Sequence, residues 1–286
     1  MKYAFIHANT AQFSVAAMCR NLSVGRSGYY DWRKRPVSER QKESQRLDAE
    51  IRADFERKKQ REGSPRLTLA LCERGIAVSE NTVANRMKSM DLRAKAKKKF
   101  KATTNSAHDL PVAPNLLRRE FSAAKPNTVW VTDITYLRCD EGWMYLAVMI
   151  DLYSRKVVGW SIGSRMTAQL VCDALKMAWF KRKRPTGVIV HSDRGSQYCS
   201  GDFQGLLAEY EMHSSMSRKG DCWDNAVAES FFHSLKVEAI HGEHFETRAS
   251  LREVVFEYIE IYYNRERRHS TLNYKTPEQF EQRKAA

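Results

Sequence analysis

Three consecutive runs of β-branched and aromatic residues constrain the fold of this chain more than any other feature. The runs are TVWVTDITYL (128–137), WMYLAVMIDL (143–152) and RKVVGWSI (155–162). Because only short turns containing CDEG and YS separate them, they predict an antiparallel meander of three strands. Any fold assigned to the chain must therefore begin its sheet with three sequential strands.

After residue 162 the pattern alternates between helix and strand. We expect a helix over 167–180, a strand over 186–193, a helix over 202–210, a short strand over 211–217 and a helix from residue 224. The resulting order, βββαβαβα, predicts an α/β fold with a mixed sheet and helices packed on its faces. This order is the one seen in ribonuclease-H-like domains.

The first 92 residues predict an all-α region. Two helix pairs with short turns lie within residues 13–35 and 64–90, and a charged helix lies between them over 47–60. Ser64 and Ser79 are expected to begin helices of the second pair. Helix, short turn and a second helix with basic side chains suit a helix-turn-helix that enters the major groove of DNA. A plain helical hairpin is the alternative.

Positive charge is concentrated in the front of the chain. The net charge is +14, and residues 1–106 hold 24 Lys and Arg against 11 Asp and Glu, whereas the remainder holds 24 against 23. A basic module joined to a nearly neutral one indicates a polyanion partner such as nucleic acid, although a solvated basic surface is the simpler reading.

A basic and polar linker is expected between the two parts. Residues 93–101, RAKAKKKFK, contain six basic residues and no acid, and a polar run with prolines follows. Such a segment repels itself and cannot bury a core, so we expect it to link domains and touch phosphate through Lys97, Lys98 and Lys99. A nuclear-import signal is the rival interpretation. The predicted division is 1–92, 93–120 and 121–286.

The cysteines and the hydropathy exclude other classes. The six cysteines form no C-x-x-C motif, which argues against a disulfide framework or a cysteine zinc site and suits a reducing cytosol. No run of about 18 apolar residues occurs, so we expect no membrane-spanning helix and no secretory leader.

Three acidic residues are the candidate chemical centre. Asp133 interrupts an apolar strand, Asp193 ends another, and Glu229 shares a helical stripe with Asn225, His233 and Lys236. Carboxylates from two strands and one helix can converge into an oxygen-rich site that suits Mg²⁺ or Mn²⁺. Each acid alone has an ordinary alternative, namely an ion pair, a turn cap or a surface helix position.

Four segments together resemble a known family. The segments are TDITY, HSDRGSQY and DNAVAESFFHSLKVE, with 35 residues between Asp193 and Glu229, and the tail YYNRERRHSTLNYKTP over 262–277. They resemble the catalytic core of DDE transposases and retroviral integrases. More narrowly, the chain resembles the second reading-frame product of the bacterial two-frame insertion-sequence family, whose full transposase arises by frameshifting.

The resemblance implies a set of roles by position. Asp133, Asp193 and Glu229 match the metal-binding triad, with Asp133 bridging two Mg²⁺ or Mn²⁺ ions, and Lys236 matches the residue that contacts DNA near the cut. Five further positions match residues that recur in the family with less defined roles, namely Asn225, His191, Gln197, Arg268 and His269. Of these, Asn225 and Arg268 are expected to contact DNA. His241 and His244 lack a second pair of zinc ligands, so we expect a surface loop there.

The resemblance also implies the reaction and the partners. The implied reaction is metal-dependent cleavage at insertion-element ends, followed by strand transfer of the 3′-hydroxyl into target DNA. The implied partners are DNA, further copies of the chain on DNA and the product of a preceding reading frame, in the bacterial cytoplasm at the nucleoid. Two alternatives are a ribonuclease-H-like nuclease that only hydrolyses and a catalytically silent DNA-binding regulator.

Overall fold

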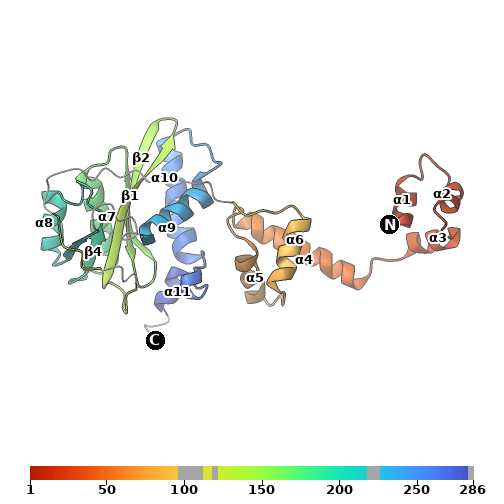
Figure 1. The fold of residues 1–286 in the computed structure, drawn as a ribbon, viewed down its shortest axis with the longest axis horizontal. Coiled ribbons are helices and arrows are strands. Elements are labelled where there is room, and N and C mark those ends of the chain that lie inside the picture. The colour runs from red at the N-terminus through yellow and green to blue at the C-terminus, as the bar shows by residue number, and fades with distance from the viewer. Residues whose placement is uncertain (96–111, 118–121, 218–225, 283–286) are drawn as a thin grey trace.

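A computed structural model describes residues 1–95, 112–117, 122–217 and 226–282. The molecule is elongated, with a sheet-containing core at one end, a helical body beside it and a further group of three helices at the N-terminal end (Figure 1). Within the described residues, no helix is both long enough and apolar enough to cross a membrane.

One five-stranded mixed sheet forms the core, in the order β3-β2-β1-β4-β5. Its strands are β1 (Val129–Cys139), β2 (Gly142–Asp151), β3 (Val157–Gly163), β4 (Ile189–Ser192) and β5 (His213–Met216). The first three are antiparallel neighbours, and β4 and β5 run parallel to β1. The predicted meander and the order βββαβαβα are confirmed, and the α/β ribonuclease-H-like class is confirmed with them.

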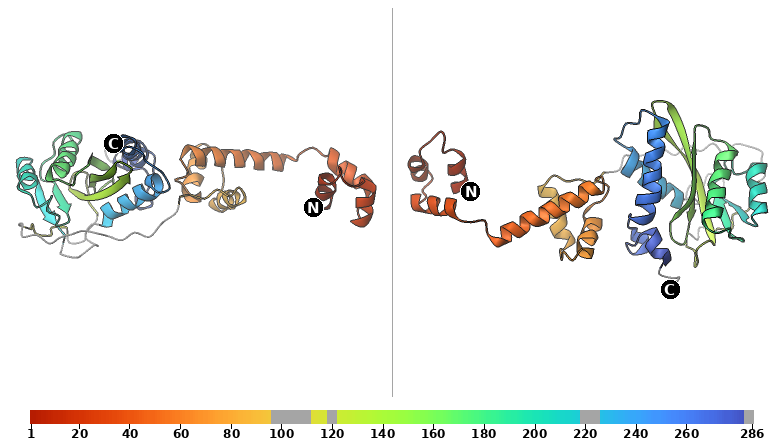
Figure 2. Two further views of the ribbon diagram at one scale, coloured as in Figure 1. Left: turned by 90° about the horizontal axis from the view of Figure 1, so that it is seen from above. Right: turned by 180° about the vertical axis from the view of Figure 1, so that it is seen from behind.

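Helices cover both faces of the sheet (Figure 2). They are α7 (Ala168–Lys181) and α8 (Gly201–Glu209) on one face, and α9 (Ala226–Leu235), η2 (Lys236–Ile240), α10 (Arg248–Phe256) and η3 (Glu257–Tyr263) on the other. The alternation of β1 divides the core, because Val131 packs with α9 and α10 whereas Trp130 packs with α7 and α8. A sheet buried on both faces explains why the strands read as nearly continuous apolar runs.

The end of the chain returns along the core. After η3 come a short 3₁₀ turn, η4 (Ser270–Leu272), and α11 (Pro277–Gln282). Residues 112–117 lie beside β5, where the Leu116 amide donates to Ser215 Oγ at 2.9 Å. Residues 96–111 and 118–120 of the predicted linker, including Lys97, Lys98 and Lys99, lie outside the described residues.

The N-terminal region is all helical, as predicted, and it forms two hydrophobic clusters. The helices are α1 (Lys2–Ala8), α2 (Val15–Asn21), α3 (Arg26–Lys34), α4 (Glu39–Arg57), α5 (Ser64–Glu73) and α6 (Glu80–Ser89). The first three helices enclose Ile6 and Tyr29, and the last three enclose Ile51 and Leu67. We call the second group the α4–α6 body.

Helices α2, α4 and α6 each begin after a serine side-chain cap, whereas Ser64 is the first residue of α5 and not its N-cap, which is Gly63. Ser79 accepts the amide of Thr82 at 3.2 Å and begins α6, as the sequence predicts. Helix α4 begins at Glu39, eight residues before the expected start, because Ser38 accepts the amide of Gln41 at 3.3 Å. The intervening residues are good helix formers, so the cap sets the true boundary.

Candidate functional site

The pairing of β1 with β4 places two aspartates at one edge of the sheet. The strands are parallel and in register at Val131 and His191, so Asp133 and Asp193 each follow two residues later. Neighbouring strands lie about 4.8 Å apart. Because β4 ends at Ser192, Asp193 stands at the carboxyl end of its strand beside Asp133, where α/β sheets place their ligand sites.

Glu229 enters from helix α9, which packs on β1. The apolar side of α9 is buried through Ala228, Phe231 and Leu235, whereas Glu229 remains exposed. Of the polar stripe predicted for this helix, Glu229 is exposed, His233 and Lys236 are half-buried, and Asn225 lies outside the described residues. Partial burial raises the pKa of Glu229 above its usual range.

Electrostatics join the three acids, which we call the acid cluster. Burial raises the pKa of Asp133 well above its usual range, and the negative charges of Asp193 and Glu229 raise it further. The ammonium of Lys236 opposes them. Burial in turn lowers the pKa of Lys236, against the charge of Asp133. Three carboxylates and one lysine thus share one electrostatic environment.

Local hydrogen bonds orient the two aspartates. The Ile134 amide donates to Asp133 Oδ1 at 2.8 Å, and the Gly195 amide donates to Asp193 Oδ1 at 2.9 Å. A Cβ atom at residue 195 would lie 3.0 Å from Asp193 Oδ1, so glycine permits this close turn. The phenol of Tyr198 is buried next to them, and its pKa is raised by burial and by both aspartates.

The donor set suits a hard divalent cation, but it is not a closed cage. Carboxylate oxygens are the ligands that Mg²⁺ and Mn²⁺ prefer, and the mutual repulsion of the acids would be relieved by a cation. Among the described residues, no three Asp, Glu, His or Cys side chains are arranged to hold one ion together. Catalytic Mg²⁺ sites commonly use one or two carboxylates and complete their coordination with substrate phosphate.

The other residues singled out by the sequence lie in different surroundings. His191 is buried, and its Nδ1 lies 2.8 Å from Ser215 Oγ, which ties β4 to β5. Gln197 donates to the Met166 carbonyl at 3.2 Å. His244 is exposed and lies 3.1 Å from Asp140. Asn225 lies outside the described residues.

Arg268 and His269 lie in the C-terminal tail. Arg268 is buried and pairs with Glu73 of α5. Burial, together with the charge of Arg267, lowers the pKa of His269 to about 3. The ring of His269 packs edge-on against Tyr263, with ring centroids 4.9 Å apart.

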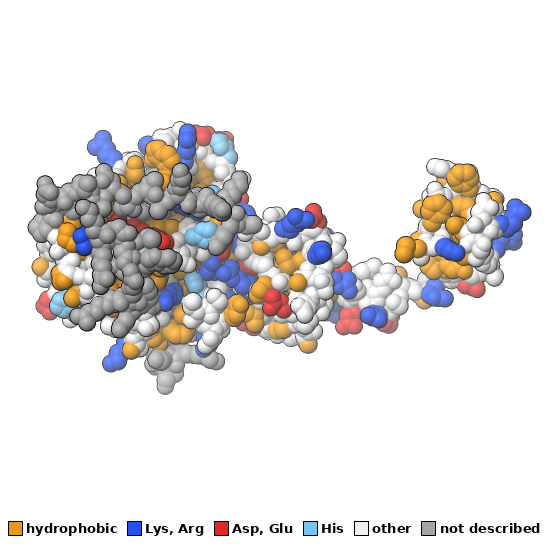
Figure 3. All heavy atoms as spheres, viewed as in Figure 1, with side chains coloured by type: hydrophobic (Ala, Val, Ile, Leu, Met, Phe, Trp, Pro, Cys, Tyr) orange, Lys and Arg blue, Asp and Glu red, His pale blue; other side chains and the backbone are white. Residues whose placement is uncertain are grey.

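Sequence reasoning missed a charged contact between the α4–α6 body and the core. The members of this contact, which we call the junction cluster, are Arg61, Arg66, Glu238, Glu257 and Arg267. Basic side chains gather where the two bodies meet (Figure 3). The partners are up to 196 residues apart in the sequence, so no local pattern could have paired them.

Glu238 is the buried centre of the junction cluster. Arg267 grips both carboxylate oxygens at 2.9 Å, and the Tyr258 hydroxyl donates to Oε2 at 2.7 Å. Burial opposes ionisation, but the guanidinium of Arg267 outweighs it, so the pKa of Glu238 lies below its usual range. Glu238 therefore remains ionised in the interior and fixes the C-terminal tail to η2.

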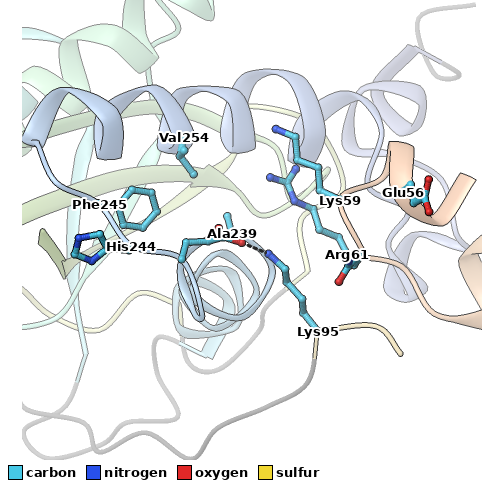
Figure 4. Close-up of a pocket in the computed structure, with 10 residues that line it drawn as sticks. Glu56, Lys59, Arg61, Lys95, Ala239, His244, Phe245 and Val254 are labelled. Carbon is cyan, nitrogen blue, oxygen red and sulfur yellow. Dashed lines mark hydrogen bonds and ion pairs between the residues drawn. The ribbon is translucent and has the colours of Figure 1, made fainter. Parts of the chain in front are cut away.

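Arg61 connects this centre to the α4–α6 body. Its guanidinium donates to both carboxylate oxygens of Glu257, at 3.2 and 2.9 Å. It also lies over the ring of Tyr262, 4.7 Å from the centroid. A cleft of about 420 Å³ opens beside it (Figure 4), where Lys95 reaches Glu243 at 2.7 Å. Charged side chains of both bodies line this cleft.

Comparisons with known proteins match both parts of the chain to domain families. Residues 123–222 and 229–284 match models of the integrase core domain, and residues 42–100 match an HTH-like domain. The chain is 55% identical over the full length of both chains to the transposase InsF for insertion sequence IS3A from Escherichia coli K12.

Two further proteins are similar. A 31 kDa protein of insertion element IS600 from Shigella sonnei is 45% identical, over 93% of this chain and 98% of that one. The solved catalytic core domain of HTLV-2 integrase is 17% identical, with a TM-score of 0.43, over 56% of this chain and 99% of that one.

Proposed function

Because this chain belongs to the integrase-core transposases of insertion sequences, alongside InsF of IS3, we propose that the acid cluster is its catalytic centre. The protein is a DDE-type transposase, a polynucleotidyl transferase that acts on DNA. The observation that supports the assignment is the parallel register of β1 and β4, which sets Asp133 beside Asp193. The influence of Glu229 on the pKa of Asp133 adds the third acid.

We assign Asp133, Asp193 and Glu229 as the ligands of two divalent cations, Mg²⁺ or Mn²⁺. Bound divalent cations activate an attacking water or 3′-hydroxyl and stabilise the leaving oxygen of a phosphodiester. The amides of Ile134 and Gly195 hold one oxygen of each aspartate in place. The carboxylates therefore meet the incoming phosphate already oriented.

Lys236 is the proposed phosphate contact beside the acids. Its ammonium interacts with the charge of Asp133, and burial makes it easier to deprotonate than a surface lysine. A lysine at this point offsets the repulsion between the carboxylates and an anionic strand. Its role in the reaction is to position the strand, and the acid cluster carries the chemistry.

Further DNA contacts are proposed outside the acid cluster. Lys97, Lys98, Lys99 and Asn225 are proposed to contact phosphate, and Arg268 would have to leave Glu73 to do so. We propose that residues 1–92 recognise the element ends, that 93–120 link them to the core of 121–286, and that copies of the chain assemble on DNA. We also propose that a preceding frame product takes part and that the protein acts at the nucleoid.

A joining assay with a pre-cut end tests the catalytic assignment. A duplex with a free 3′-hydroxyl is incubated with target DNA, Mg²⁺ and the full chain, and joined product is measured. Asp133→Ala, Asp193→Ala and Glu229→Ala should each lower joining by more than the roughly 10–100-fold that an outer-shell partner costs. Glu209→Ala, which removes an exposed acid on α8, is the matched control.

The products of the same assay separate the alternatives. Joined DNA identifies transfer, whereas hydrolysed DNA alone would identify a nuclease, and neither product from the wild-type chain would identify a silent regulator. Joining by Glu229→Ala at the wild-type rate would remove Glu229 from the site.

A further inference from the structure

Two large aromatic side chains are exposed on the β1–β2 hairpin, close to the acid cluster. Tyr136 is 41% exposed and Trp143 is 46% exposed. Their rings pack edge-on with centroids 5.2 Å apart. The strand register pairs Tyr136 with Tyr145 and Arg138 with Trp143, so these side chains share one face of the hairpin. We call Tyr136 and Trp143 the aromatic pair.

Two cationic side chains lie against the rings of the aromatic pair. The guanidinium of Arg138 lies 5.8 Å from the centroid of the Trp143 ring, and Lys236 Nζ lies 4.9 Å from that of Tyr136. Lys236 is also the residue whose charge interacts with Asp133. One lysine therefore connects the acid cluster to the aromatic pair.

The distance from the acids fits a short stretch of DNA. Tyr136 follows Asp133 by three residues, which is about 10 Å along a strand, and this odd spacing sets the two side chains on opposite faces of β1. That distance along the strand equals the rise of about three stacked nucleotides. A DNA strand that contacts both would pass around the edge of β1, where Lys236 interacts with both residues. Beyond Val131, no strand among the described residues pairs with this edge of β1, because β4 pairs with β1 only over Val129, Trp130 and Val131. Lys236, the first residue of η2 directly after α9, reaches the Tyr136 ring.

We propose that the aromatic pair is a stacking platform for the unpaired bases of the DNA strand held at the acid cluster. This proposal rests on the proposed function of that cluster. Every nucleobase has an aromatic face, so Tyr and Trp rings bind single strands with little sequence preference. Arg138 and Lys236 supply the positive charge that the flanking phosphates require. Bases held here would fix the strand so that the phosphate to be cut meets Asp133 and Asp193.

The charge on the platform argues for a nucleic-acid strand rather than a protein partner. The aromatic pair lies beside two cations and next to acids that must receive a phosphodiester. A purely structural role would be to stabilise the hairpin through a cross-strand aromatic contact. The two roles differ in what is lost when Trp143 is removed.

A binding experiment separates the roles. The probes are two duplexes of one mixed sequence with a five-nucleotide 3′ overhang, which is either base-bearing or abasic. Both probes carry the same phosphates, so the ratio of their affinities measures the contribution of the overhang bases to binding. Binding to the full chain is measured by fluorescence anisotropy at fixed salt in EDTA. We expect the wild type to bind the base-bearing overhang about tenfold more tightly.

Trp143→Ala and Tyr136→Ala should bring this ratio close to one, and Trp143→Phe should retain most of it. Phe180→Ala is the matched control, because Phe180 also packs edge-on against a tryptophan beneath an arginine, on α7. That variant should keep the full ratio. Melting temperatures of all variants are measured in parallel to show that they fold.

Three outcomes would overturn the platform. They are a wild-type ratio close to one, an unchanged ratio in both alanine variants, and a change of oligomeric state in Trp143→Ala that accounts for the lost binding. Because no strand is cut in EDTA, this result does not depend on catalysis. A failed joining assay with an intact affinity ratio would instead refute the catalytic assignment alone.

Discussion

At the scale of single residues, Asp133 bears the electrostatic cost of the acid cluster. Burial and two neighbouring acids raise its pKa, so its ionised form destabilises the metal-free fold at neutral pH. Asp133→Asn should therefore raise the melting temperature in EDTA, by about 2–4 °C for each kcal/mol gained. Mg²⁺ should raise the melting temperature of the wild type and leave that of the variant nearly unchanged.

Differential scanning fluorimetry with and without Mg²⁺ checks this prediction. Glu209→Gln, an exposed acid on α8, is the control and should respond like the wild type. If Asp133→Asn lowered the melting temperature in EDTA, Asp133 would stabilise the fold and the like-charge interpretation would be wrong.

His269 should make the protein sensitive to acid. Its pKa is lowered to about 3 in the folded protein, against about 6.5 in an unfolded chain. Below pH 6.5 the unfolded state binds a proton that the folded state does not, so stability falls as the pH falls. The loss should reach about 1–2 kcal/mol at pH 5 and be absent above pH 7.

Urea unfolding at pH 7 and pH 5 measures this loss. His269→Asn should reduce the difference between the two pH values, whereas the exposed control His213→Asn should leave it unchanged. A wild-type stability that is equal at both pH values would show that His269 is protonated in the fold.

Which residues could be predicted from the sequence depends on how local their signal is. Asp133 and Asp193 are detectable because a charged residue within or at the end of an apolar strand is costly unless something binds it. Glu238 and Arg267 give no such signal, since each has charged residues nearby in the sequence and only the tertiary fold buries them together. Trp143 reads as an ordinary strand residue until its exposure is known.

At the scale of elements, the packing of β3 against α7 depends on Gly159. A Cβ atom there would lie 2.3 Å from the Ala174 carbonyl oxygen and 2.6 Å from the Ala178 nitrogen. Gly159→Ala should thus force the strand and helix apart and cost about 1–3 kcal/mol. Gly205, inside α8, has no neighbour within 4 Å of such a Cβ, and Gly205→Ala should stabilise by about 0.5–1 kcal/mol.

Chemical denaturation of the two variants compares the same substitution at a position where the new Cβ would clash and at one where it has free space. Equal stability changes in Gly159→Ala and Gly205→Ala would contradict the close approach of β3 to α7.

Strands and caps were more predictable than the C-terminal helices. The strands carry dense β-branched and aromatic runs, and Ser79 marks a helix start by its own hydrogen bond. The π-helical segments η2 and η3 were not predicted. Their widened turns bring Glu238 and Tyr258 to the junction cluster, and side-chain periodicity at 100° per residue carries no information about such a local change.

At the scale of the whole molecule, the α4–α6 body is held to the core by charge. The side chain of Arg61 is 4% exposed and forms a bidentate salt bridge with Glu257. Breaking a buried pair by removing one partner costs about 3–5 kcal/mol. Arg61→Ala should release the body, so that calorimetry resolves two unfolding transitions and small-angle scattering gives a larger radius of gyration than in the wild type.

Arg57→Ala is the matched control for this release. Arg57 lies four residues before Arg61, at the end of α4, is 59% exposed and pairs only locally with Asp54 among the interactions described. It should leave both the scattering and the unfolding unchanged. If the scattering curve of Arg61→Ala superimposed on that of the wild type, contacts other than Arg61 would be enough to hold the α4–α6 body to the core.

The docking of the two bodies could not have been predicted from the sequence. The basic front of the chain indicates a polyanion partner, and several of its cations instead bind acids of the core. Net charge reports the sum over a region and not the partner of any one side chain, so an internal salt bridge and a DNA contact look alike in a sequence.

The order of synthesis follows from the separation of Arg61 and Glu257 along the chain. These two residues are 196 positions apart. A ribosome adding about 5–20 residues per second needs roughly 10–40 s to cover that interval. The α4–α6 body therefore leaves the exit tunnel long before Glu257 has been translated. During this time its arginines are available to other anions in the nascent chain.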